Sequence, residues 1–228
     1  MKRGQKSMNK KFTIKDFIAP IVAAVVTLVF CILVFVVDVA TIGPENTSVG
    51  FAALNGAFSQ QFGFNETLYD ISDYLGYLSI LGVGIFACLG LYQLIKNKGL
   101  AGVDKEILLL GGLFVLIFAL YVGFDKLALN FRPVILPGET SPEASFPSSH
   151  TLMSCVVMGA IAMVLPKYIK NKKLSVALRV LCILILAATV FCRLFSGVHW
   201  VTDIVASLLI SMTLLMFFRT LLLNLRSK

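Results

Sequence analysis

Residues 146–165 read FPSSHTLMSCVVMGAIAMVL, a short polar turn that leads directly into a long apolar run. His150 stands at this junction and is one of only two histidines in the chain. The other, His199, lies in the stretch CRLFSGVHWVTD (192–203), at the start of another apolar run. Ionisable groups in apolar surroundings are costly unless they are partnered, and in membrane segments they usually serve a function. The sequence therefore predicts membrane-spanning helices with a functional site at their ends.

The overall composition agrees with a membrane protein. The chain has 228 residues, which predicts one domain. Hydrophobic residues make up 58% and charged residues 14%, with a mean hydropathy of +0.90. Soluble domains are about half apolar and about a quarter charged. The net charge of +8 could suggest nucleic-acid binding, but the distribution of the charge, mostly in loops and termini between apolar runs, excludes that class.

Six apolar runs are long enough to cross a hydrocarbon core of about 30 Å. They are Phe17–Val37, Tyr74–Ile95, Ile107–Phe124, Ser149–Leu165, Leu174–Phe191 and Trp200–Leu222. The first run could be a signal peptide, but it is too long and lacks a cleavage site of small residues. We therefore expect an all-α, polytopic membrane protein: a basic cytoplasmic N-terminus (1–16), a six-span domain (17–222) and a cytoplasmic tail (223–228).

The basic residues predict the orientation in the membrane. They gather in the N-terminus, between spans two and three, between spans four and five, and in the tail: Lys2, Arg3, Lys6, Lys10, Lys11, Lys15, Lys96, Lys98, Lys105, Lys167, Lys170, Lys172, Lys173, Arg226 and Lys228. All these segments fall on one side, which the positive-inside rule makes cytoplasmic. The opposite loops hold only Lys126, Arg132 and Arg193. We expect a plasma-membrane protein whose site faces the non-cytoplasmic side.

Two further features concern the outer segment 39–70 and the cysteines. Phe51, Leu54, Phe58 and Phe62 recur at helical spacing, which fits a helix lying on the membrane surface or one packed against the bundle. The five cysteines fall in or beside apolar runs without metal-type spacing, so we expect buried free thiols. Trp200 is a natural anchor at the membrane–water interface.

Three short motifs lie between Lys126 and Asp203. The first runs from Lys126 to Arg132-Pro133, the second is Pro147-Ser148-Ser149-His150, and the third runs from Cys192-Arg193 through His199 to Asp203. In order and spacing they resemble the type 2 phosphatidic acid phosphatase superfamily. Its motifs are Lys, six residues, Arg-Pro; Pro-Ser-Gly-His; and Ser-Arg, five residues, His, three residues, Asp. The superfamily includes membrane lipid phosphate phosphatases and soluble vanadium haloperoxidases, and the apolar spans favour the membrane branch.

The match has three departures. Lys126 and Arg132 are separated by five residues, Ser149 stands at the usual Gly, and Cys192 stands at the usual Ser. Ser149 keeps the backbone N–H that the position offers. The shorter spacing leaves two readings of Lys126: a phosphate ligand, as the resemblance implies, or a lysine that extends toward the interface.

His199 and Asp203 are four residues apart and would share one helical face. A carboxylate that holds one ring nitrogen leaves the other free to attack. A structural pair that caps a helix is the alternative. The resemblance implies that His199 is the nucleophile, forming a phosphohistidine, and that Asp203 orients it.

His150 begins a span, where free backbone N–H groups can hold phosphate oxygens. Ser148 can cap that helix, contact phosphate, or do both. The resemblance implies that His150 is the general acid and then the base for water. It also implies that Lys126, Arg132, Ser148, Ser149 and Arg193 bind phosphate. Guanidinium groups are suited to bidentate contact, whereas a lysine acts as a point charge.

These observations predict a lipid phosphate or diphosphate phosphohydrolase that needs no metal or other cofactor. The site would lie between helices at the outer membrane face, and the substrate tail would remain in the bilayer. The resemblance admits an isoprenyl diphosphate such as undecaprenyl diphosphate, phosphatidic acid and phosphatidylglycerophosphate. A non-enzymatic transporter or scaffold with a phosphate pocket is the alternative. The intact pair of histidines favours the enzyme.

Overall fold

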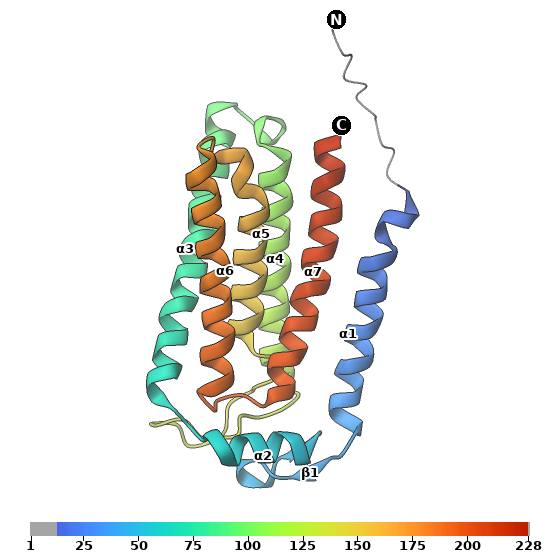
Figure 1. The fold of residues 1–228 in the computed structure, drawn as a ribbon, viewed down its shortest axis with the longest axis vertical. Helices are drawn as coiled ribbons and strands as arrows, with labels where there is room; N and C mark the ends of the chain where they lie inside the picture. The colour runs from blue at the N-terminus through green and yellow to red at the C-terminus, as the bar shows by residue number, and fades with distance from the viewer. Residues whose placement is uncertain (1–12, 228) are drawn as a thin grey trace, which may run out of the picture.

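The computed structural model describes residues 13–227, and within them six long helices stand side by side as a bundle (Figure 1). They are α1 (Ile18–Val36), α3 (Glu66–Lys96), α4 (Lys105–Leu127), α5 (Ser149–Tyr168), α6 (Lys172–Phe195) and α7 (Val201–Ser227). A short 3₁₀ turn, Ile14–Phe17, extends α1 at its start. All six are long and apolar enough to cross a membrane. The predicted all-α, six-span architecture is confirmed.

The second span is longer than its apolar run predicts. Helix α3 begins at Glu66 because Asn65 caps it, accepting a hydrogen bond from the Leu68 N–H at 3.0 Å. The apolar pattern begins only at Tyr74, because the first two turns contain acidic residues. Those turns add Tyr69 and Asp73 to the helix, and both residues lie in the site described below.

Helix α5 occupies the centre of the bundle. It contacts α3, α4, α6 and α7. In its most apolar stretch, 72% of the residues are buried, whereas the corresponding share is 44% or less in every other span described. Small residues let neighbouring helices come close, as is usual where lipid removes the hydrophobic drive for association. A methyl group added at Gly159 would lie 2.6 Å from Leu215 of α7, and one at Gly82 of α3 would lie 2.7 Å from Ile161.

One end of the bundle carries most of the irregular structure. After α1, strands β1 (Ala40–Thr41) and β2 (Ser48–Val49) pair antiparallel, with Ala40 opposite Val49. A long loop joins α4 to α5 and folds back on itself, forming a bridge between Phe131 and Ala144. Figure 1 shows this loop beneath the ends of the long helices, beside the turn that joins α6 to α7.

Helix α2 (Ala52–Phe62) lies across the same end of the bundle (Figure 1). Its Asn55 is buried and bonded to Thr202 of α7, and Phe62 contacts the ring of Phe195 with centroids 5.0 Å apart. Leu54 remains 52% exposed. The helix is thus packed on the bundle while it leaves apolar side chains uncovered, and its contact with a membrane surface stays a prediction.

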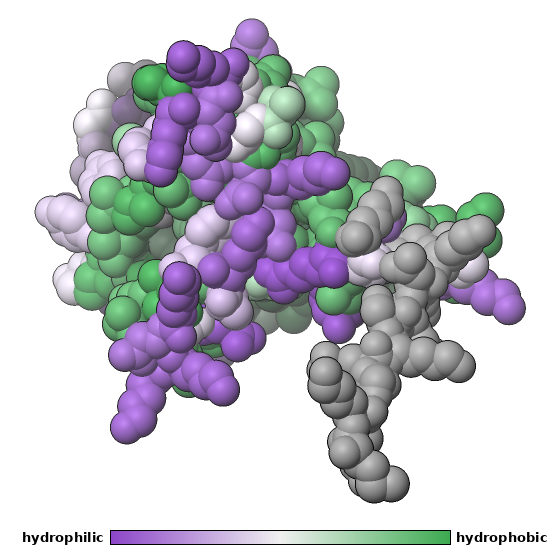
Figure 2. Space-filling view, turned by 90° about the horizontal axis from the view of Figure 1, so that it is seen from above, coloured by the Kyte–Doolittle hydropathy of each residue, from purple (hydrophilic) through white to green (hydrophobic). Residues whose placement is uncertain are grey.

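The other end of the bundle is polar. The α3–α4 and α5–α6 connections and the C-terminal end of α7 lie there together (Figure 1). Figure 2 looks onto this end and shows hydrophilic side chains gathered over it. The basic residues before Thr13, and Lys228, lie outside the described residues. The three motifs and the basic loops therefore occupy opposite ends, as the charge pattern predicts.

The five cysteines are free thiols, as expected. The expectation that all are buried is wrong for Cys88, which is exposed on α3, while Cys31 of α1 is only partly buried. Both lie on spans whose apolar surface faces outward, where a thiol behaves as a small hydrophobic group.

We predict that the loop between α4 and α5 is outside the cell. A cysteine introduced at exposed Ser141 should react with a membrane-impermeant maleimide in intact cells, because basic loops are retained in the cytoplasm. A cysteine at exposed Lys170, at the opposite end, should react only after permeabilisation. The reverse pattern would place the site on the cytoplasmic side.

Candidate active site

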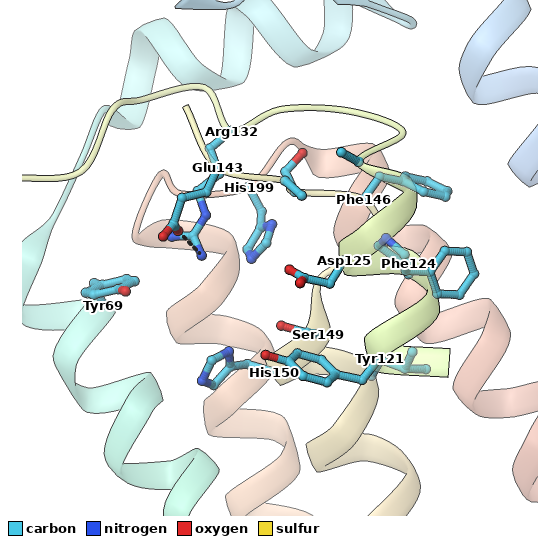
Figure 3. A pocket seen from close by; sticks show the side chains of 15 residues that line it. Tyr69, Tyr121, Phe124, Asp125, Arg132, Glu143, Phe146, Ser149, His150 and His199 are labelled. Carbon is cyan, nitrogen blue, oxygen red and sulfur yellow. Dashed lines mark ion pairs between the residues drawn. The ribbon is translucent and has the colours of Figure 1, made fainter. Parts of the chain in front are cut away.

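A cavity of about 510 Å³ opens at the loop-rich end of the bundle, between α3, α4 and α5. Side chains from all three motifs line it: Arg132, Ser149, His150 and His199. Figure 3 shows both imidazoles at the cavity, His150 from the start of α5 and His199 from the turn before α7. Residues from all three motifs are thus brought together around one space.

The α4–α5 loop delivers Arg132 to this cavity. Its backbone N–H donates to the Glu143 carbonyl at 2.9 Å, and the two side chains form an ion pair at 3.0 Å (Figure 3). The indole N–H of Trp200 donates to the carbonyl of Phe131 at 2.7 Å. Trp200 is 2% exposed, so the prediction that it anchors the membrane interface is wrong. It instead ties the third motif to the first.

His199 lies just before α7, rather than on the helix as expected, because α7 begins at Val201. Its Nδ1 is 3.6 Å from the Asp203 carboxylate, which is long for a hydrogen bond. The same carboxylate accepts the backbone N–H of Trp200 at 3.1 Å, so it also caps the start of α7. The alternative capping role is therefore present, whereas the orienting hydrogen bond to His199 stays a prediction.

The turn before His199 requires glycine. Gly197 has φ +72°, a left-handed conformation that side chains with a Cβ adopt at a cost. A methyl group there would also lie 1.8 Å from the carbonyl oxygen of Gly63, in the segment between α2 and α3. The turn is thereby pressed against that segment, which fixes where His199 projects.

Burial and nearby positive charge keep His199 neutral. The residue is 4% exposed, and burial lowers its pKa well below the ordinary value. The charges of Arg132 and Arg193 lower this pKa further. The imidazole thus remains neutral, and hence nucleophilic, at pH values where an ordinary histidine becomes protonated.

Arg193 and His150 share a carboxylate that the motifs do not contain. Arg193 is fully buried near the end of α6, and its guanidinium donates to Asp73 of α3. The same Asp73 oxygen lies 3.3 Å from His150 Nε2. Tyr69, one turn earlier, stacks under Arg193 with its ring centroid 4.9 Å from the guanidinium carbon. Sequence reasoning missed both α3 residues, although Asp73 next to an apolar span is a signal that could have flagged it.

Three predicted phosphate ligands do not line the cavity: Lys126, Ser148 and Arg193, of which Arg193 is fully buried with unpaired guanidinium atoms. Lys126 is exposed near the end of α4, and its neighbour Asp125 lines the cavity instead. Ser148 is buried, and its hydroxyl donates to Thr151 at 3.0 Å. That hydroxyl makes no cap to the α5 backbone either. Phosphate binding by Lys126 and Ser148 stays a prediction that the geometry does not favour, and phosphate binding by Arg193 stays a prediction.

Several polar atoms around the cavity are buried without a hydrogen-bond partner among residues 13–227. They include both ring nitrogens of His199, the Nε and Nη1 atoms of Arg132 and Arg193, and one oxygen of Asp203. Buried polar groups are normally satisfied, so unpaired donors of this kind indicate a site for an anionic ligand. Among the same residues, no group of three or more His, Cys, Asp or Glu side chains could hold a metal ion.

Comparison with known families accounts for this arrangement. The model of the PAP2 superfamily matches residues 106–227. The chain belongs to the PAP2 superfamily. The matched residues contain α4 to α7 with both histidines, whereas α1 to α3 lie before them. A search of curated protein sequences found no match.

The fold is similar to a solved structure described as the first transmembrane PAP2 type phosphatidylglycerolphosphate phosphatase from Bacillus subtilis. The two share 19% sequence identity with a TM-score of 0.62, over 92% of this chain and 97% of that one. This likeness concerns the fold, and at 92% coverage it extends well beyond the residues that the family model matches. The family supports phosphatase activity rather than the non-enzymatic alternative, and the six apolar helices support a multi-pass membrane protein.

We predict that Lys126→Ala lowers kcat/KM much less than Arg132→Ala. Lys126 is exposed, whereas Arg132 offers unpaired guanidinium donors at the cavity, and losing one such donor typically costs about 10²-fold or more. Rates on a soluble phosphate ester in detergent would measure the difference. Equal losses would mean that Lys126 turns into the cavity when substrate binds.

We also predict that Gly197→Ala destabilises the protein. Left-handed strain costs about 1–3 kcal/mol, and overlap with Gly63 adds to it. Gly138→Ala is the matched control, because Gly138 has φ +91° but open space around its Cα. Thermal unfolding in detergent should show a larger drop for Gly197→Ala. Equal drops in unfolding temperature would show that the close approach to Gly63 does not contribute to the destabilisation.

Proposed function

We propose that the protein hydrolyses a membrane lipid phosphate or diphosphate through a phosphohistidine on His199, without a metal ion. The observation that carries the proposal is the state of His199. Its two ring nitrogens are buried at the cavity without a hydrogen-bond partner among residues 13–227, beside unpaired donors of Arg132 and Arg193. An anionic phosphoryl group would satisfy those donors while it presents phosphorus to the imidazole.

The first step transfers the phosphoryl group to the protein. Since Asp203 faces Nδ1 of His199, Nε2 is the attacking atom. A bond forms between Nε2 and phosphorus, and the bond from phosphorus to the lipid oxygen breaks. Asp203 stabilises the positive charge that grows on the ring. The separation of 3.6 Å can shorten at this stage, because catalytic hydrogen bonds are often long before substrate binds.

Charge on the phosphoryl oxygens is stabilised from two directions. Arg132 and Arg193 offer guanidinium donors from the α4–α5 loop and from α6. The start of α5 offers backbone N–H groups, and Ser149 at its first position lines the cavity. These groups are held in place before substrate arrives, which is the condition for strong electrostatic stabilisation of a transition state.

His150 moves the protons in both steps. In the first it gives a proton to the departing lipid oxygen. In the second it takes a proton from water, and the resulting hydroxide attacks phosphorus. The bond between phosphorus and Nε2 then breaks, which releases inorganic phosphate and restores neutral His199. The two histidines therefore have different tasks, consistent with their different surroundings.

The substrate would be a lipid whose headgroup enters the cavity from the membrane. The volume of about 510 Å³ falls in the usual range for small-molecule sites and suits a phosphorylated headgroup rather than a whole lipid. The apolar tail would remain among the exposed hydrophobic flanks of the bundle. Isoprenyl diphosphates such as undecaprenyl diphosphate, phosphatidic acid and phosphatidylglycerophosphate all fit this description. The phosphatase from Bacillus subtilis, by its description, acts on the last of these. The site would face the non-cytoplasmic side of the plasma membrane.

We predict an acid-labile, base-stable phosphoenzyme that depends on His199. Rapid quench with a ³²P-labelled lipid phosphate, in the presence of a chelator, should trap it in the unaltered protein and not in His199→Ala. With a nitrophenyl phosphate, whose leaving group needs little protonation, His150→Ala should still form it. A phosphoenzyme that persists in His199→Ala and vanishes in His150→Ala would reverse the two roles.

A further inference from the structure

Helix α3 supplies one wall of the site, although it precedes the residues matched by the superfamily model. Three of its residues face the catalytic groups on successive turns. Tyr69 lies under Arg193, Asp73 contacts both Arg193 and His150, and Gly76 lies against the His150 ring. Positions separated by three or four residues share one face of a helix, so this wall is continuous.

Two contacts determine how the His150 ring lies. A methyl group at Gly76 would come within 3.0 Å of His150 Cδ2 and 3.5 Å of Nε2, so the glycine lets the ring rest on α3. Oδ1 of Asp73 then lies 3.3 Å from Nε2 of the ring. The nearby hydroxyl of Ser79 donates to Ser154, and that of Ser154 donates to Thr189. Because these hydroxyls are bonded to one another, Asp73 is the acceptor that faces Nε2 among the described residues.

We propose that Asp73 is a positioning residue for His150 in the two proton transfers, a role that rests on the proposed function. Its carboxylate accepts the Nε2 proton, which fixes the ring and its tautomer and leaves Nδ1 to exchange protons. In the first step the Nδ1 proton passes to the lipid oxygen. In the second, Nδ1 takes a proton from water. The carboxylate stabilises the imidazolium that is present before the first transfer and is restored by the second.

The same carboxylate has a second partner, and any test must separate the effect of losing that partner from the effect on His150. Asp73 also balances the charge of Arg193, which is fully buried. A buried charge that loses its partner destabilises its surroundings, so a variant at Asp73 could lose activity without acting through His150. A leaving-group comparison and a double-mutant cycle distinguish these two routes.

The experiment compares Asp73→Asn, His150→Ala and the double variant in the full-length protein. Asparagine keeps the shape of the side chain and removes its charge. For each variant, kcat/KM is measured on phosphatidic acid, a poor leaving group, and on nitrophenyl phosphate, a good one. Asp70→Asn is the matched control, since Asp70 is exposed on the same helix.

On phosphatidic acid we expect Asp73→Asn to lower kcat/KM about 10-fold or more. This loss is part of the ~10²–10⁴-fold rate increase that proton transfer contributes. The loss on nitrophenyl phosphate should be much smaller. In the His150→Ala background, Asp73→Asn should have no further effect on either substrate. Asp70→Asn should behave like the unaltered protein.

Two results would overturn the proposal, and they have different meanings. Asp73→Asn could lower kcat/KM equally on both substrates, or its full effect could add to that of His150→Ala. Either result would mean that Asp73 acts through Arg193 or through stability alone. Such a result leaves the proposed function intact. If His150→Ala itself loses equally on both substrates, His150 is not the proton donor, and the proposed function fails together with this role.

Discussion

The guanidinium of Arg193 is charged and fully buried, and the loop-rich end of the bundle is arranged around that constraint. An unpaired charge at such a depth would cost several kcal/mol, so a partner has to come from within the protein. Helix α3 provides it, with Asp73 as the counter-charge and Tyr69 as an aromatic face beneath the cation. The requirement holds α3 and α6 together at the cavity, and it brings a carboxylate to His150 as well.

The central position of α5 turns this local pairing into a site. Its start places His150 and Ser149 at the cavity, while its buried length contacts four other spans. Helix α7 secures that start, because Ser207 donates to the carbonyl of Ser148 and the backbone N–H of Ser148 reaches the carbonyl of Asp203. The two histidines therefore keep a fixed relation, which the proposed reaction requires, because His199 would take the phosphoryl group while His150 gives and takes the protons.

The charges around the cavity are balanced in a way that suits an anionic substrate. Glu143 and Asp73 each satisfy one side of an arginine, and each arginine keeps further donors unpaired. The paired carboxylates offset the cost of burying the arginines, and the unpaired guanidinium donors remain available to attract phosphoryl oxygens. The same cations lower the pKa of His199, so the groups proposed to bind phosphate would also prepare the proposed nucleophile.

The sequence by itself determined the six spans, the separation of basic loops from the motifs, and the candidate residues His150, His199, Arg132 and Arg193. Hydrophobic run length and charge distribution are local properties that a bilayer enforces, and the motifs lie within one stretch of chain. Only the tertiary structure decided which side chains share the cavity. Lys126 turned away because helix rotation placed Asp125 there instead, and Trp200 was buried because the α4–α5 loop folded over it. Asp73 entered the site from a helix far from the motifs, since partner choice for a buried charge depends on which helices pack together, a relation that no local pattern contains.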